Sequence, residues 1–349
     1  MFRLPLLFIA TGILSFLAFH VLSLFSLGSW VGEPPRNPEG WFRIHLIVLD
    51  WGTMIAMGAV YQLLDVVLQR KLHSHKLGYL HYACFLIGSS ILLIGFLRLE
   101  VSWIAAGATM TWLGICLFAW NIGQTMLLAA KWNAITVSTA CAVVYLVLTG
   151  LFVILLWNAA TLLGAGHFLL GSGTLFNGIV IGLMMAALVT YEAHMRDIRK
   201  HRHKGSPGSG IRWSIFCTRG LIVYVVMLLG IWFVKPDLFE DETLLILTGW
   251  IYLYGWVAMT ILGYLSKIVP FLWWTHKYGP LAGKMKVPVM NDLIQDGNVK
   301  VGMAGMCGGL LLILLGIGFK VMLLVWGGGC LLSVCSILYM GLIARVFTR

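Results

Sequence analysis

Charged residues are scarce in this chain of 349 residues. Asp, Glu, Lys and Arg together make up 11% of it, whereas hydrophobic residues make up 60%. A water-soluble core cannot bury so much apolar surface, so the soluble fold classes are excluded. The composition predicts a polytopic membrane protein, and because lipid offers backbone amides no partner, we expect its spans to be helices.

Cysteine is present but forms no pattern. None of the seven cysteines belongs to a CxxC pair, and most lie inside apolar stretches. This spacing argues against a zinc site and a disulfide framework, and it favours buried free thiols. The first apolar stretch has no small-x-small cleavage site, so we expect a retained helix there rather than a signal peptide.

Apolar runs of about 20 residues recur along the whole chain. They predict an all-α fold, a single transmembrane domain of about ten helices. A basic segment, residues 194–213, is expected to be a cytoplasmic loop that joins a six-helix half (1–193) to a four-helix half (214–349). The expected spans are residues 4–31, 41–64, 79–99, 101–130, 134–156, 165–191, 214–234, 243–269, 300–319 and 321–346.

Basic residues fall mainly on one side of these spans. If the N-terminus is cytoplasmic, 19 of the 24 lysines and arginines flank the inner ends, which is the positive-inside pattern. Both termini are then cytoplasmic, and we expect a multi-pass protein of a bacterial inner membrane. The net charge of +11 reflects this topology and suits anionic lipid, and it does not indicate a nucleic-acid partner.

Four histidines fall within the predicted spans, where an ionisable group is costly and marks a candidate site. His45 and His167 share a depth, since both lie within roughly 6 Å of the outer boundary, whereas His20 lies roughly 15 Å down. His81 enters from the cytoplasmic side and belongs to a different layer.

Small residues follow both outer histidines at helical spacing. Below His167 lie Gly171, Thr174, Gly178 and Gly182, and below His45 lie Leu49, Gly52, Ala56 and Ala59. Two such faces predict a groove for the edge of haem b, with the neutral imidazoles of His45 and His167 as axial ligands. The alternative is that the small faces only let helices pack closely, while the histidines hydrogen-bond across them.

Asp50 is a carboxylate about nine residues into the second span, where it must be paired, protonated or hydrated. Pairing with Arg43, Arg98 or a histidine is one interpretation. The other is proton or cation handling. With His81 and the glycine faces, it would make the chain a transporter or permease for a small solute or metal.

A faint internal repeat relates the second and eighth spans. Trp51 and Gly58 lie seven residues apart in one, and Trp256 and Gly263 lie seven apart in the other. Trp250 stands where the second span has His45. The spacing indicates a duplicated segment.

The segment HLIVLDWGTMIAMGAVYQLL, residues 45–64, resembles the second span of subunit I of the haem-copper oxidases. GWVAMTILGYLSKIVPFLWWTHKYG and the following KVPVMNDL resemble the late span and loop of small subunit-I-like proteins, a group that includes the NnrS proteins. The resemblance covers about a third of the chain. It implies a subunit-I-like scaffold in which His45 is an axial ligand of a low-spin haem.

The histidines of a complete oxidase centre are missing. Spans 300–319 and 321–346 contain no histidine, and span 243–269 carries Trp250 and Trp256 where ligands would be needed. We therefore expect neither copper nor turnover chemistry. The expected function is electron transfer, haem handling or gas sensing with one haem b. His20 would be a spare or distal group. The expected partners are respiratory oxidase or cytochrome subunits. An assembly factor for a respiratory complex is a further alternative.

Overall fold

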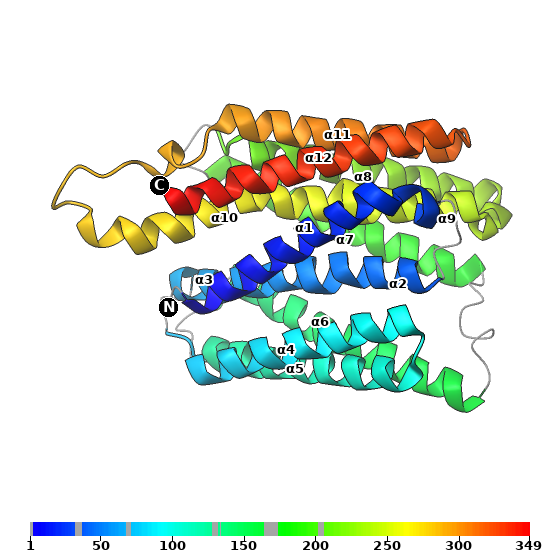
Figure 1. The fold of residues 1–349 in the computed structure, drawn as a ribbon, viewed down its shortest axis with the longest axis horizontal. Helices are drawn as coiled ribbons and strands as arrows, with labels where there is room; N and C mark the ends of the chain where they lie inside the picture. The colour runs from blue at the N-terminus through cyan, green and yellow to red at the C-terminus, as the bar shows by residue number, and fades with distance from the viewer. Residues whose placement is uncertain are drawn as a thin grey trace. The chain divides into compact units, whose positions relative to one another are not determined.

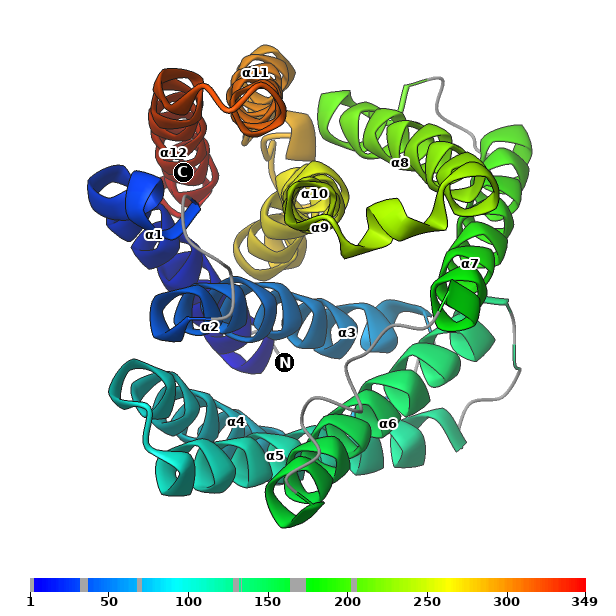
Figure 2. The ribbon, with the colours of Figure 1, turned by 90° about the vertical axis from the view of Figure 1, so that its right-hand side faces the viewer.

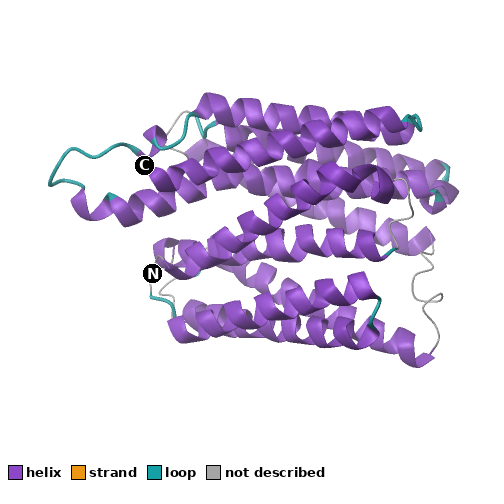
Figure 3. Ribbon diagram, viewed as in Figure 1, coloured by secondary structure: helices purple, strands orange, loops and turns teal. Residues whose placement is uncertain are grey.

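A computed structural model of the chain describes residues 3–31, 37–67, 71–127, 132, 134–163, 174–201 and 206–349. Helices make up nearly all of these ranges, and no strand occurs within them (Figure 3). The all-α class is therefore confirmed. Eight helices in the described ranges are long and apolar enough to cross a membrane, so the chain is a multi-pass membrane protein.

Two compact units share the chain, whose helices are labelled in Figure 1. The first comprises Met1–Phe19 and Pro35–Gly171, and the second comprises His20–Pro34 and Ser172–Arg349. One boundary thus falls within helix α1 (Arg3–Val31), which contributes its first part to one unit and its remainder to the other.

The first unit is completed by one long span, a helical hairpin and a further helix. Asn37 caps the span, since its side chain accepts a hydrogen bond from the Gly40 amide at 2.6 Å. Phe8, Tyr61 and Phe85 lie in the buried core of the unit. Its elements are α2 (Pro38–His45), π-helix η1 (Leu46–Thr53), α3 (Met54–Val67), α4 (His75–Arg98), α5 (Val101–Leu127) and α6 (Ala134–Leu163).

The second unit also contains a long span interrupted by a π-helix, and it ends in the hairpin of α11 and α12, seen beside each other in Figure 2. Its helices are α7 (Thr174–His201), α8 (Ser209–Val234), α9 (Glu242–Trp250), π-helix η3 (Ile251–Ala258), α10 (Met259–Lys277), α11 (Asp296–Gly318) and α12 (Met322–Ala344). Short 3-10 turns connect them: η2 (Pro236–Glu240), η4 (Gly279–Leu281), η5 (Met290–Asp292) and η6 (Arg345–Thr348).

Helices occupy all ten predicted segments in whole or in part. The basic segment 194–213, expected as a loop, is helical at both ends, because α7 continues to His201 and α8 begins at Ser209. Glu192 and Arg196 form an ion pair one turn apart on α7, which supports a helix that extends beyond the apolar stretch.

The two π-helices, η1 and η3, lie at equivalent places in the chain. They have the same length, so that Leu46 of η1 corresponds to Ile251 of η3 in a register that needs no gap. This register also aligns Trp51 with Trp256, and the α-helices that follow begin at equivalent methionines, Met54 and Met259. π-helical stretches are rare, so two in one register are strong support for an internal repeat.

The preceding helices repeat in the same register. A methyl group built on Gly58 of α3 would lie 3.2 Å from the Pro5 carbonyl oxygen of α1. A methyl group built on Gly263 of α10 would meet the carbonyl of Gly210 of α8, and Gly210 is the counterpart of Pro5 when Trp51 is aligned with Trp256. Each glycine therefore lies at a close approach of its span to the helix before it.

The two hairpins form a second matched pair, in a register of their own. Gly88 of α4 faces the Thr111 amide of α5, and Gly309 of α11 faces the Leu332 amide of α12 in the same way. Aligning these two glycines also aligns the hairpin turns, which contain Leu99 and Lys320, both with positive φ (54° and 57°). The order α1, α2–α3, α4, α5 thus recurs as α8, α9–α10, α11, α12.

Candidate functional site

His45 ends α2 and is half-buried. Its Nδ1 lies 2.7 Å from the Trp41 carbonyl oxygen, and its ring packs on Phe96 with 4.4 Å between centroids. A carbonyl only accepts hydrogen bonds, so Nδ1 carries the proton and Nε2 carries the lone pair. Nε2 makes no hydrogen bond with a described residue, which is the state that a metal-ligating imidazole requires.

The small-residue stripe expected below His45 does not form one face. Gly52 is buried whereas Ala56 is exposed, and Leu49 and Ala59 are intermediate. The π-helix η1 is the reason, because its i→i+5 hydrogen bonds widen the turn and rotate the residues that follow. The regular α-helical spacing therefore predicted the wrong face for this span.

His167 and Gly171 lie outside the described residues, so the expected pairing of His167 with His45 stays a prediction. Gly178 lies on α7, where a methyl group would come within 2.5 Å of the Trp232 ring of α8. Gly182, by contrast, has nothing within 4 Å of such a methyl group. Gly178 thus permits close contact between α7 and α8, as the packing interpretation predicts.

Asp50 is buried in η1 and reaches across to α4. Its Oδ1 accepts a hydrogen bond from the Ser89 hydroxyl at 2.6 Å, whereas its Oδ2 has no partner among the described residues. Among the described residues, none of the partners considered for Asp50, namely Arg43, Arg98 or a histidine, forms a hydrogen bond or ion pair with it. Arg43 binds Glu39 at 2.6 Å, one turn away on α2.

His81 is buried on α4 in an aromatic cage and is hydrogen-bonded through Nδ1 to the Tyr61 hydroxyl at 3.1 Å. Phe8 stacks on its ring at 4.8 Å between centroids, and Phe118 lies at 5.2 Å. Ser89, the partner of Asp50, lies eight residues further along α4, roughly 12 Å away at the α-helical rise. His81 and Asp50 therefore do not share a site.

His20 lies in the second unit, fully buried in a polar cluster that the sequence did not reveal. Its Nδ1 lies 3.2 Å from the Ser333 hydroxyl and its Nε2 lies 3.0 Å from the Tyr254 hydroxyl, which is 2.6 Å from that of Ser336. Both ring nitrogens are engaged, so His20 would have to break one of these bonds to ligate iron.

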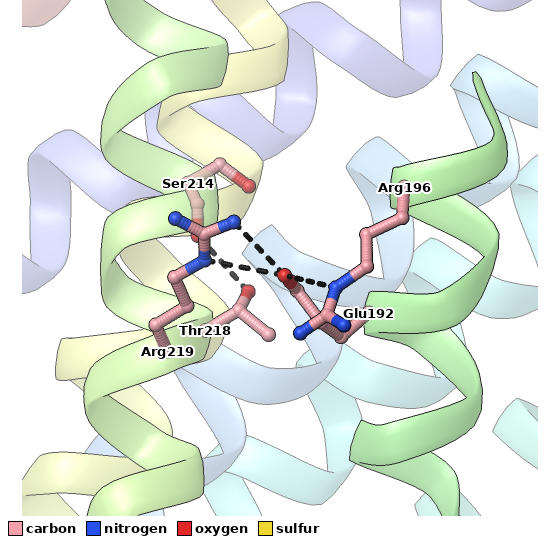
Figure 4. Close-up of polar contacts among 5 residues, drawn as sticks. All are labelled: Glu192, Arg196, Ser214, Thr218 and Arg219. Atoms are coloured by element: carbon pink, nitrogen blue, oxygen red, sulfur yellow. Dashed lines mark hydrogen bonds and ion pairs between the residues drawn. The ribbon is translucent and has the colours of Figure 1, made fainter. Parts of the chain in front are cut away.

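A charged cluster in the second unit was also missed (Figure 4). Glu192 of α7 is buried, and its Oε1 lies 2.9 Å from Nη2 of Arg219 on α8 and 3.2 Å from Nε of Arg196. Thr218, beside Arg219, accepts a hydrogen bond at 3.0 Å from the Trp256 indole of η3. The Glu192–Arg219 ion pair thus joins α7 to α8 in a polar part of the unit.

This cluster forms one wall of a cavity of about 940 Å³ within the second unit. A second carboxylate in its lining, Asp296, accepts hydrogen bonds from the Ser209 amide (2.7 Å) and hydroxyl (2.6 Å) at the start of α8. The basic residues of the lining are Arg196, Arg199, Arg212, Arg219 and Lys267. The sequence explains the basic residues by topology and by attraction to anionic lipid, and only the fold shows which of them line one cavity.

No group of three or more His, Cys, Asp or Glu residues suited to a metal ion occurs in the part of the chain that the structure describes. The described cysteines are free thiols. No protein-family model and no curated protein matches the chain.

Proposed function

We propose that the chain is a ten-helix protein of a bacterial inner membrane that binds one haem b through His45 and His167 near the extracytoplasmic face. Its role is electron transfer, haem handling or gas sensing beside respiratory oxidase or cytochrome subunits. The resemblance of residues 45–64 to subunit I of the haem-copper oxidases supports this function. Both termini are then cytoplasmic, and copper is not part of the site.

The observation that carries the proposal is the protonation of His45. Its Nδ1–H donates to the Trp41 carbonyl, which leaves the Nε2 lone pair available for iron. The carbonyl also fixes the ring orientation. Bound haem would supply one-electron chemistry or a site for a diatomic gas, and His45 would orient it.

The absorption spectrum of the full-length protein, purified from haem-replete cells, tests this function. We expect a Soret band that is lost in His45→Ala and in His167→Ala. His75→Ala is the matched control, because His75 is exposed at the start of α4, and its spectrum should equal that of the wild type. Colourless wild-type protein would contradict haem binding.

Transport of a small solute or cation is a second candidate, and Asp50 is the observation that favours it. Its carboxylate is buried in a span with one oxygen unpartnered among the described residues. The repeated four-helix arrangement is also typical of several transporter folds. The equivalent position in the second repeat is Gly255, so the carboxylate belongs to one copy alone.

Uptake of the small solute or cation into vesicles that contain the purified protein separates the two candidate functions. Asp50→Asn should abolish uptake while leaving the yield of folded protein intact. Asp237→Asn, in the exposed acidic segment before α9, is the control and should transport like the wild type. Unchanged flux in Asp50→Asn would count against transport.

A further inference from the structure

The cavity of the second unit has an excess of positive charge. Five basic side chains line it against two carboxylates, Glu192 and Asp296. They come from α7, α8 and α10, so residues far apart in the sequence line one cavity. The positive-inside pattern does not require basic residues to lie close together. Exposed lysines such as Lys284, in the loop after α10, contribute to that pattern equally well.

The two carboxylates neutralise only part of this charge. Glu192 is bound by Arg219 and Arg196, and Asp296 lies 3.6 Å from Arg212. Arg199 makes no ion pair with a carboxylate of the described residues. The cavity therefore attracts an anion, and arginine is well suited to bind the oxygens of a phosphate.

Lys267 lies against Gly208, in the lining of the same cavity. Gly208 has a φ of +90°, which favours glycine, and a methyl group on Gly208 would lie 2.5 Å from the Lys267 Nζ and 3.2 Å from Asp296 Oδ1. Helix α8 starts at the next residue, Ser209. The ammonium group of Lys267 is thus held close to the start of α8, where the helix dipole adds to the positive potential.

Glu192 defines a second requirement for the ligand. Its Oε2 is buried and has no hydrogen-bond partner among the described residues, although Oε1 is bound by two arginines. A buried carboxylate oxygen calls for a donor. The phosphate group of an ester is mostly fully ionised at neutral pH and then has no such donor, but a hydroxyl or primary ammonium group on the same ligand would provide one.

Much of the remaining lining is apolar and belongs to the same unit. Its apolar side chains are those of Met195, Ile211, Ile215, Met290 and Ile294, and its other polar side chains are those of Ser206, Tyr264 and Asn291. A wall of this kind favours an organic phosphate over the bare ion, because the carbon atoms of the ester gain apolar contact.

We propose that this cavity binds a phosphate ester that carries a hydroxyl or primary ammonium group. The phosphate lies among Arg199, Arg212 and Lys267, and the donor group reaches Glu192. Two sources share this chemistry: the headgroup of an anionic or aminated phospholipid, and a water-soluble phosphate ester. The site is separate from the haem proposed at His45, and its occupancy is measured without haem.

Two binding measurements on the full-length protein, purified in detergent and stripped of lipid, test the site. Isothermal titration uses glycerol 3-phosphate as the soluble probe. Native mass spectrometry counts bound phosphatidylglycerol against bound phosphatidylcholine, whose headgroup has no hydrogen-bond donor, after each lipid has been added back. Saturable binding of glycerol 3-phosphate identifies a soluble ester as a ligand. Retention of phosphatidylglycerol over phosphatidylcholine identifies a lipid headgroup.

Variants show whether either ligand occupies this cavity. The double variant Arg199→Gln with Lys267→Gln should bind at least about tenfold more weakly, since two charge-assisted contacts are removed. Arg199→Lys with Lys267→Arg keeps both charges and should restore most of the binding. Lys284→Gln is the matched control, because it removes one charge outside the cavity lining and should bind like the wild type. The proposal is overturned if neither probe binds, or if the double variant binds as tightly as Lys284→Gln.

Discussion

Trp51 and Trp256 hold equivalent positions in two π-helices, yet only the Trp256 indole is hydrogen-bonded to a residue that the structure describes. The Trp256 Nε1 donates to the Thr218 hydroxyl at 3.0 Å. The Trp51 Nε1 is buried without an acceptor among the described residues, and its ring lies 4.5 Å from that of Phe16. The repeat has therefore kept the two aromatic rings but not the polar contact of one of them.

The residue equivalent to Thr218 in the first repeat is Ile13, which is buried. We expect Ile13→Thr to give the Trp51 indole an acceptor. Ile13→Val is the matched control, because valine has the shape of threonine without the hydroxyl. The threonine variant should be more stable than the valine variant by about 1 kcal/mol, the usual value of one hydrogen bond. Unfolding of the two purified variants in detergent measures the difference, and a more stable valine variant would refute the equivalence.

The glycines of the hairpin contacts give a second prediction. A methyl group on Gly309 would lie 2.6 Å from the Leu332 amide nitrogen, whereas one on the neighbouring Gly308 has nothing within 4 Å. The backbone of α12 cannot move aside as a flexible side chain can. The methyl group added by Gly309→Ala should therefore destabilise the protein by about 1–3 kcal/mol. Gly308→Ala should be neutral or stabilising by up to about 1 kcal/mol. Thermal unfolding compares them, and equal effects would mean that the hairpin does not pack this closely.

The positions of the helices were predictable because each span is a long apolar run. The π-helix of Leu46–Thr53 was not predictable, since nothing in LIVLDWGT differs from an α-helical pattern. The repeat was visible only as Trp51 and Gly58 against Trp256 and Gly263. The matched hairpin glycines escaped notice because the loop after Lys277 is longer than its counterpart in the first repeat, which shifts the hairpins out of the register of the preceding spans.

The candidate site residues were predictable from the sequence only in part. Single buried polar residues, such as Asp50 and His81, were predictable from the cost of placing them in lipid. Their partners were not, because Ser89 and Tyr61 are common residues whose roles depend on how helices face one another. The cavity around Glu192 depends wholly on tertiary structure.

Ser89 supports Asp50, and its removal gives a third prediction. Ser89→Ala would leave both carboxylate oxygens of Asp50 without a partner among the described residues. We expect a loss of about 1–3 kcal/mol of stability, the usual cost of an unsatisfied buried group. Ser90→Ala is the control, because Ser90 is exposed and bonds only to the Leu86 carbonyl of its own helix, and it should change stability by less than about 0.5 kcal/mol. Denaturant titration compares the two, and equal stabilities would show that Ser89 does not support Asp50.

Glu192 lies just beyond the predicted span 165–191, and it gives the protein a defined response to acid. Burial alone would raise the pKa of its carboxyl, but the hydrogen bonds and charges of Arg219 and Arg196 outweigh burial and hold the pKa below its usual value. A carboxyl with a lowered pKa stabilises the folded state above the unfolded-state pKa, about 4.3. That contribution is lost as the pH falls from there through the folded-state pKa.

We therefore expect the stability of the wild-type protein to fall on acidification below about pH 4.3, and Glu192→Gln to show a smaller fall over the same range. Arg219→Gln removes the partner nearest to Glu192 and should flatten the profile in the same direction. Because Arg219 is about half exposed, solvent screens the pair, and the effect should be modest. Unfolding midpoints measured from pH 3 to pH 7 test this, and profiles parallel to the wild type in both variants would show that the ion pair contributes nothing to acid sensitivity.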